Sequence, residues 1–418
     1  MLKVALLTHD NRGGGASLAV SRLARGLTLI SSKHRIANTL LLSELENRDH
    51  QISKLKIGTT FNNHSLDILI STLLSRVWSR LHNVQSDPRS FYMSGYKNTS
   101  GFLHDYDVIN LFWLQKFASL RDLSDLNKPL VITLHDMWFL TGGCSYSFEC
   151  EEYQRGCLSC DYISKPFRRD ASKQYYLKSK LLLRESTQVV VTSRWMKNIA
   201  INRGVDERRI SLIRNYIPPT YQYLANKSLA LKLLGINNDL TDKYILYFVG
   251  SISDSRKGFD LFINALSLLS FEIRKNLLVI HLGPYDDRFD SILEKLDINI
   301  IHLGCFVDEI SQVLAYNASD FLVCPSRFDN TPNVIAEAHM CGLPVIASGN
   351  SGCIEMIDQA MDGIIVDVYD ADLFAKSLSR ALSCINNFDK SKIALTASQR
   401  YCLESTCFPY VSLYNSML

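Results

Sequence analysis

The sequence lacks the features that would mark a membrane or fibrous protein. No apolar run approaches the roughly 18–20 residues that a membrane-spanning helix needs, and there is no internal repeat or low-complexity tract. The first residues, MLKVALLTHD, contain too short an apolar stretch for a secretory signal. With 47% apolar and 21% charged residues, the composition excludes a disordered chain, a collagen-like repeat and a disulfide-dense mini-protein. These absences predict a soluble globular protein of the cytoplasm.

Net charge is also nearly absent, because 45 basic residues offset 42 acidic ones and leave +3. This balance conceals two halves of opposite sign. Residues 1–218 hold 30 Lys and Arg against 19 Asp and Glu, whereas residues 219–418 hold 15 against 23. A basic half joined to an acidic half indicates two domains with different partners, one of them anionic. Compositional drift on solvated surfaces is the alternative.

The 418 residues are too many for one comfortable core and suit two domains. Short apolar strands alternate with helical segments in both halves, which predicts an α/β fold of two Rossmann-like, doubly wound domains facing a central cleft. The Pro218-Pro219 pair is typical of a linker. We therefore expect domains at 1–217 and 220–399, and a C-terminal helix at about 400–418 that packs back on the first domain. The predicted strands are 3–8, 38–42, 107–112, 130–134, 189–192, 244–249, 277–282, 298–303, 321–324 and 344–347.

Three glycines follow the first predicted strand and precede a helix. Glycine lets the backbone approach a ligand closely, and the amides at a helix N-terminus attract an anion. We predict that Gly14 and Gly15 help to bind an anion such as a diphosphate, with a turn that serves only packing as the alternative. The turn is not GxGxxG, so a nicotinamide dinucleotide is not favoured.

The most informative segment reads PSRFDNTPNVIAEAHMCGLPVIASGNSGCIE. A strand ends at Pro325, a loop carries Asp329 and Asn330, and a helix begins near Pro332. Glu337 follows Asp329 by eight residues, about one turn into that helix, so both carboxylates can face one pocket. The helix N-terminus favours phosphate oxygens at the same place. A capped helix with solvated acids is the alternative.

This segment resembles the donor-site signature of the retaining GT-B glycosyltransferases of family 4: a Glu, seven residues, a second Glu and then Ala-x-x-x-Gly-x-Pro-Val. Asp329 stands at the first Glu and Glu337 at the second, in an Asp-Asn-x-Pro-Asn variant. The resemblance implies a UDP- or GDP-sugar donor and no cofactor for catalysis. It also implies that Glu337 hydrogen-bonds the ribose, that Asp329 lies near the donor-sugar hydroxyls, and that backbone amides from Asn330 to Asn333 hold phosphate or sugar oxygens.

Two further segments resemble the same family in the expected order. In FVGSISDSRKG, Lys257 matches the Lys that neutralises the donor diphosphate. Ser251 replaces the family's usual Arg, and Arg256 is the expected substitute, so that two cations stabilise the charge on the leaving group. The segment HLGCFVD resembles the loop that contacts the base, which places Phe306 beside it.

In the first half, a predicted strand ends just before His135 and Asp136. The family places a His at this point near the donor sugar, so the resemblance implies a catalytic role for His135, with Asp136 orienting it or meeting the acceptor. A structural His at a strand end is the alternative. No second carboxylate pair has the spacing of a glycosidase, so hydrolysis through two acids is not supported.

Four cysteines lie within 17 residues and end in CxxC. In a reducing compartment this spacing predicts a structural zinc site, because four thiolates form a closed tetrahedral shell. Free packing thiols and disulfides are the alternatives. The four are Cys144, Cys150, Cys157 and Cys160.

The basic excess has two candidate locations, an amphipathic helix at 65–81 and a later basic cluster. Both suit an anionic membrane surface, with a core-packed helix and solvated cations as the alternative. Because the family binds its acceptor on the N-terminal domain, the resemblance implies a polyprenyl-diphosphate-linked glycan as acceptor. The later cluster is Lys165, Arg168, Arg169, Lys173, Lys178 and Lys180.

Together these features predict a metal-independent, retaining glycosyltransferase that moves a hexose-type sugar from a nucleotide sugar to a lipid-linked glycan. We expect it in bacterial surface-polysaccharide or lipopolysaccharide biosynthesis, peripheral at the inner face of the plasma membrane. One alternative is a soluble transferase that acts on a free sugar or small metabolite. The other is a non-enzymatic protein that binds nucleic acid or lipid, but the sequence has no aromatic RNA-recognition signature and no nucleic-acid partner is expected.

Overall fold

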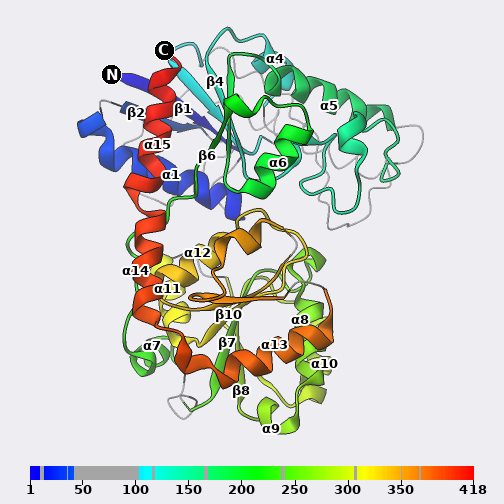
Figure 1. Cartoon of the computed structure of the whole chain (residues 1–418), viewed down its shortest axis with the longest axis vertical. Coiled ribbons are helices and arrows are strands. Elements are labelled where there is room, and N and C mark those ends of the chain that lie inside the picture. Colours follow the sequence, from blue (N-terminus) through cyan, green and yellow to red (C-terminus); the bar gives the residue numbers. More distant parts are fainter. Residues whose placement is uncertain are drawn as a thin grey trace. The chain divides into compact units, whose positions relative to one another are not determined.

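The computed structural model describes residues 1–9, 14–34, 36–41, 103–114, 118–163, 168–236, 240, 242–305, 308–349, 351–366 and 369–418. The chain divides into two compact units, Met1–Tyr216 together with Leu403–Leu418, and Ile217–Cys402 (Figure 1). None of the helices in the described ranges is both long and apolar enough to cross a membrane. The amphipathic helix predicted at 65–81 lies outside the described residues.

The first unit is built on a six-stranded parallel sheet in the order β2-β1-β3-β4-β5-β6. Neighbouring residues of β1 enter two different apolar clusters, Val4 and Leu6 in one and Ala5 and Leu7 in the other. Both faces of the sheet are therefore covered, as expected for parallel strands with continuous apolar runs. The strands are β1 (Leu2–Leu7), β2 (Ile36–Leu41), β3 (Val108–Leu111), β4 (Leu130–Leu134), β5 (Thr187–Val191) and β6 (Ile210–Leu212). The described helices are α1 (Gly15–His34), α4 (Leu120–Ser124), α5 (Arg168–Leu182) and α6 (Arg194–Asn202).

The last helix of the chain, α15 (Leu403–Ser416), returns to the first unit and packs on α1 (Figure 1). The side-chain amide of Asn110 on β3 donates a hydrogen bond to the Tyr414 hydroxyl over 2.7 Å. A Cβ added to Gly26 of α1 would lie 2.5 Å from the Cys407 sulfur, so only glycine lets the two helices approach this closely. This is the helix that the sequence placed at about 400–418.

The second unit has its own six-stranded parallel sheet, in the order β12-β11-β10-β7-β8-β9. The chain runs from β7 outward to β9 and then crosses to β10 on the other side of β7. That reversal makes the carboxyl ends of β7 and β10 the topological switch point, where doubly wound sheets bind ligands. The strands are β7 (Tyr244–Val249), β8 (Leu277–Leu282), β9 (Asn299–His302), β10 (Phe321–Cys324), β11 (Val345–Ser348) and β12 (Gly363–Val366). The helices are α7 (Lys227–Leu233), α8 (Phe259–Leu268), α9 (Phe271–Arg274), α10 (Asp290–Leu296), α11 (Glu309–Ala318), α12 (Asn333–Met340), α13 (Ala371–Ser383) and α14 (Lys390–Tyr401).

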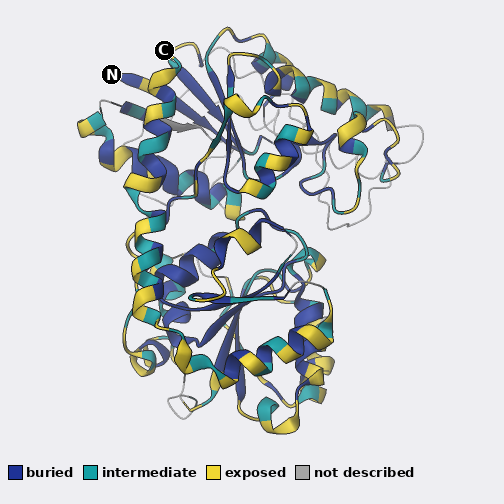
Figure 2. Cartoon of the chain, viewed as in Figure 1, coloured by how far each residue is buried: buried dark blue, intermediate teal, exposed yellow. Residues whose placement is uncertain are grey.

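The predicted α/β class with two parallel sheets is confirmed, and each predicted strand has a counterpart whose ends agree within two residues. Most strands are buried in both units, whereas the edge strands β6, β9 and β12 are only partly buried, and exposure concentrates on the outer sides of the helices (Figure 2). Two short strands, β6 and β12, were not predicted, and both lie at sheet edges. Two helices end the chain, and they belong to different units, α14 to the second and α15 to the first.

Candidate functional site

Two loops of the second unit meet at the switch point, one after β7 and one after β10. The amide of Arg327 donates to the carbonyl of Arg256 over 2.8 Å, which joins the two loops through their backbones. Gly258 has a φ of +72°, and a Cβ there would lie 2.0 Å from the Pro325 carbonyl oxygen. Only glycine therefore allows the loop after β7 to turn into α8 at this place.

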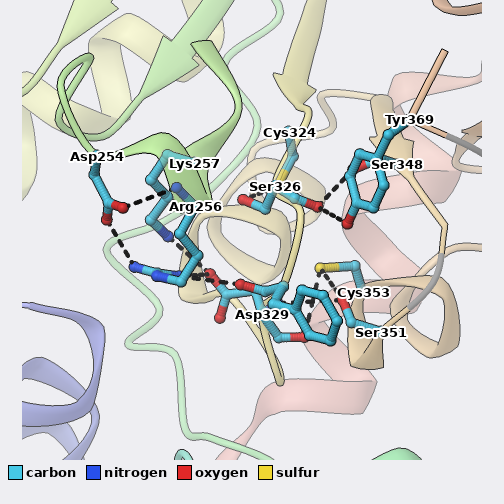
Figure 3. Close-up of polar contacts among 11 residues, drawn as sticks. Asp254, Arg256, Lys257, Cys324, Ser326, Asp329, Ser348, Ser351, Cys353 and Tyr369 are labelled. Atoms are coloured by element: carbon cyan, nitrogen blue, oxygen red, sulfur yellow. Dashed lines mark hydrogen bonds and ion pairs between the residues drawn. The ribbon is translucent and has the colours of Figure 1, made fainter. Parts of the chain in front are cut away.

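Three of the predicted site residues come together here (Figure 3). The Nζ of Lys257 lies 2.8 Å from Oδ2 of Asp329, and a guanidinium nitrogen of Arg256 lies 3.1 Å from the same oxygen. Arg256 also pairs with Asp254 over 3.1 Å. Burial by itself raises the pKa of Asp329, but the charges of Lys257 and Arg256 outweigh it and hold that pKa below its ordinary value. The site therefore holds an ionised, buried carboxylate between two cations.

A second contact, which sequence reasoning missed, holds the backbone of the Asp329 loop in place. The amide of Asp329 donates to the Ser351 hydroxyl over 3.2 Å, and the amide of Gly352 donates to the Asp329 carbonyl over 3.1 Å. A Cβ on Gly352 would lie 1.8 Å from the carbonyl oxygen of Asn330. The sequence signal for this contact is Gly352, the second glycine of GNSGCIE, but its spacing does not show which loop Gly352 contacts.

Glu337 lies on α12 with only 2% of its surface exposed. The Tyr316 hydroxyl of α11 donates to Oε2 of Glu337 over 2.6 Å. Burial, and then the negative charge of Glu337, raise the pKa of Tyr316 well above its ordinary value, so the phenol stays a donor. Asn330 and Asn333 are also buried at this helix start. Tyr316 is the second functional residue that the sequence did not reveal.

His135 and Asp136 follow β4 in the first unit, and both are partly buried. Burial lowers the pKa of His135 to about 4, although a hydrogen bond with Asn215 opposes this shift, so the ring is neutral at pH 7. Burial raises the pKa of Asp136 to about 6 against a hydrogen bond from the backbone amide of Trp138 over 2.8 Å. His135 can therefore offer a neutral hydrogen bond, whereas Asp136 remains mainly ionised at pH 7.

The glycine-rich turn is described only from Gly14 onward. Gly14 has a φ of +85°, in the left-handed region, and a Cβ there would meet nothing within 4 Å. Gly15 begins α1. Phe306, predicted near the base, lies outside the described residues.

The four cysteines of the predicted zinc site line one cavity of about 340 Å³. None of these four cysteines forms a disulfide, and the amide of Gly142 donates to the sulfur of Cys157 over 3.2 Å. Burial raises the pKa of Cys157 to about 11. In the described part of the chain, no three His, Cys, Asp or Glu side chains are arranged to hold a metal ion. The structure thus shows a cavity lined by thiols, and the zinc site remains a prediction.

The prediction that Lys178 belongs to a basic surface cluster is wrong. Lys178 is fully buried, donates to the carbonyl of Trp138 over 2.7 Å and lies 4.0 Å from the centre of that indole ring. Burial lowers its pKa to about 7. The amphipathic pattern of α5 turns this position inward, so its charge does not contribute to a surface patch.

Known protein families match both halves of the chain. The family model described as "Glycosyl transferases group 1" matches residues 243–384, which include the loops of Lys257 and Asp329. The model described as "Glycosyltransferase Family 4" matches residues 39–221. This chain is a glycosyltransferase.

Curated relatives of the glycosyltransferase include two from Escherichia coli K12. The putative colanic acid biosynthesis glycosyl transferase WcaC is 24% identical over 266 residues, which cover 61% of this chain and 62% of WcaC. The lipopolysaccharide glucosyltransferase WaaG is 30% identical over 142 residues, or 33% of this chain and 37% of WaaG. The alignments thus span less than two thirds of either relative.

Among solved structures, the glycosyltransferase resembles Anabaena HepE in complex with UDP-glucose. The TM-score is 0.66 at 16% sequence identity, and the match covers 100% of both chains. This likeness confirms the predicted GT-B fold.

Proposed function

We propose that this glycosyltransferase moves a hexose-type sugar, with retention, from a UDP- or GDP-sugar to a lipid-linked glycan in bacterial surface-polysaccharide assembly. The observation that carries the proposal is the meeting of Lys257, Arg256 and Asp329 at the switch point of the second sheet. The crystal structure of HepE with UDP-glucose and the names of WcaC and WaaG support the donor class and the type of product.

In the proposed mechanism, the second unit binds the donor. Lys257 and Arg256 take the diphosphate oxygens, and their charges stabilise the leaving group without reorganisation, because Asp329 already orients both of them. Glu337, held by Tyr316, hydrogen-bonds the ribose. Asp329 contacts hydroxyls of the donor sugar.

The first unit supplies the acceptor side. Neutral His135 hydrogen-bonds the donor sugar, and Asp136 meets the acceptor. The leaving diphosphate accepts the proton of the acceptor hydroxyl as the new glycosidic bond forms on the same face, so no protein nucleophile is needed. No step in this scheme uses a metal ion.

The basic first half supports an anionic, lipid-linked acceptor. Four residues of α5 are exposed at a spacing that places them on one face of the helix, and the Nζ of Lys180 lies 5.0 Å from the centre of the Tyr176 ring. A basic face with an aromatic ring suits anionic head groups. The four are Arg169, Lys173, Tyr176 and Lys180.

Thermal-shift measurements separate this proposal from a nucleic-acid-binding protein. We expect UDP or GDP to raise the melting temperature further as its concentration increases, because a ligand that binds only the folded state stabilises it. An oligonucleotide at the same charge concentration should have little effect. Stabilisation by oligonucleotides alone, or by no nucleotide at all, would contradict the proposal.

A further inference from the structure

Two histidines that have no predicted role of their own meet beside the loop that carries Lys257, and the second of them, His302, begins the HLGCFVD segment. His281 on β8 and His302 on β9 are partners in the parallel register, and their Nδ1 atoms lie 3.0 Å apart. The Nε2 of His281 lies 2.8 Å from the carbonyl oxygen of Gly250, the first residue after β7. His281 is buried, with 1% of its surface exposed, whereas His302 is exposed.

The partners of His281 define where its proton lies. A carbonyl oxygen only accepts, so the Nε2 of His281 must carry the hydrogen. In the neutral ring Nδ1 is then an acceptor, and His302 must donate through its own Nδ1. Burial lowers the pKa of His281, and the neighbouring His302 lowers it further, while the bond to Gly250 opposes both. A neutral His281 ring with its hydrogen on Nε2 can therefore donate to the carbonyl of Gly250 and accept from His302.

The carbonyl of Gly250 has little freedom to point elsewhere. A Cβ on Gly283 would lie 2.3 Å from this oxygen, and the amide of Gly250 donates to Leu282 over 2.8 Å. Gly250 itself has a φ of +144°. The aliphatic stem of Lys257 lies over Gly250, since a Cβ there would be 3.4 Å from Cγ of Lys257. Gly250, whose carbonyl oxygen lies 2.8 Å from the Nε2 of His281, is thus also the residue against which the stem of Lys257 packs.

We propose that His281 is a positioning residue for the loop after β7, which carries Lys257. It fixes the carbonyl of Gly250, and thereby the stem of Lys257. His302 in turn fixes the tautomer of His281. Aromatic rings hold the imidazole of His281 in place, with the centres of Phe248 and Phe259 at 5.7 and 6.1 Å. This inference rests on the proposed function, because it assigns the loop to a nucleoside diphosphate.

The test is calorimetric titration of the full chain with UDP, and with GDP in parallel. His281→Leu removes the donor to Gly250 and should weaken nucleotide binding about tenfold, the size of one lost hydrogen bond. His281→Gln places an amide N–H near the position of Nε2 and should restore binding to within about threefold of wild type. His302→Phe removes the group that fixes the tautomer and should give an intermediate loss. His104→Leu, at an exposed site in the first unit, is the matched control.

Three outcomes would overturn the inference. If His281→Leu binds UDP and GDP as wild type does while only its melting temperature falls, the histidine is structural. If the Leu and Gln variants lose binding equally, donation from Nε2 is not the cause. Wild-type protein that binds neither nucleotide would overturn the proposed function itself, and this inference with it.

Discussion

At the scale of single residues, Asp329 decides how the charges of the site are arranged. Its Oδ2 accepts from both Lys257 and Arg256, and only 8% of its surface is exposed. The two cations are therefore held in place before any ligand arrives. Preorganised charge of this kind stabilises a developing anion better than side chains that must first be ordered.

Lys257→Ala tests this arrangement. We expect donor turnover to fall about 100-fold or more, because in the proposed mechanism Lys257 is one of two preorganised cations that stabilise the leaving group. The fold should survive, since Lys257 is partly exposed and Asp329 keeps Arg256 as a partner. Lys376→Ala is the matched control, because that lysine is 70% exposed on α13 and pairs with Asp372. A folded Lys257→Ala variant with an unchanged rate would contradict the assignment.

His339 makes the second unit sensitive to acid. The ring is buried, and its Nε2 donates to the carbonyl of Asp362 over 3.2 Å. Burial, and then the charge of Arg400, lower the pKa of His339 to about 3. An unfolded His ionises near pH 6.5, so the unfolded state gains protons first and stability falls as the pH drops from that value toward 3.

We expect this one group to remove about 2 kcal/mol of stability between pH 7 and pH 5. In His339→Gln, which keeps a donor for the carbonyl but does not titrate, the loss should be smaller by that amount. Urea unfolding at both pH values measures it. Asp362, whose pKa burial raises to about 6, acts in the opposite direction and is present in both proteins. Parallel losses in the two proteins would show that His339 does not titrate as described.

At the scale of elements, the sequence predicted the strands because buried parallel strands are continuous apolar runs. It missed β6 and β12, two short strands of three and four residues that lie at sheet edges. The loops of Lys257 and Asp329 were predictable because short motifs carry their chemistry. The contacts of Ser351, Tyr316 and His281 were not, because each depends on how distant segments pack or on strand register.

The cysteine segment offers a further test at this scale. The spacing predicts about one structural zinc ion per chain, and the four thiols do share one cavity. Elemental analysis of purified protein should find that zinc, and a Cys157→Ser/Cys160→Ser variant should lose it, with Cys305→Ser at an exposed site as the control. Zinc-free protein in which all four thiols react with a thiol reagent would contradict the prediction and support packing thiols.

At the scale of the whole molecule, the near-zero net charge describes neither half. The basic half contains the proposed acceptor side, and the acidic half contains the loops in which we propose that Arg256 and Lys257 bind the donor. This division predicts that contact with an anionic membrane runs through the first unit, and that salt weakens it.

Cosedimentation with phosphatidylglycerol vesicles tests that division. Replacing Arg169, Lys173 and Lys180 on α5 with Ser should lower vesicle binding at least about tenfold, since each basic residue contributes about 1 kcal/mol near such a surface. A control that removes Lys232, Lys275 and Lys376 from the second unit loses the same charge and should bind as wild type does. Equal losses in both variants would mean that net charge, rather than this face, governs binding, and no binding by wild type would favour the alternative of a soluble acceptor.

The most direct test of the central claim is donor turnover by the purified wild-type chain across a panel of UDP- and GDP-sugars, followed by NMR. We predict slow release of the nucleoside diphosphate from one preferred donor, with the sugar first appearing in the same anomeric configuration that it had in the donor. If no sugar nucleotide is turned over, or the sugar first appears with inverted configuration, the proposed function is wrong.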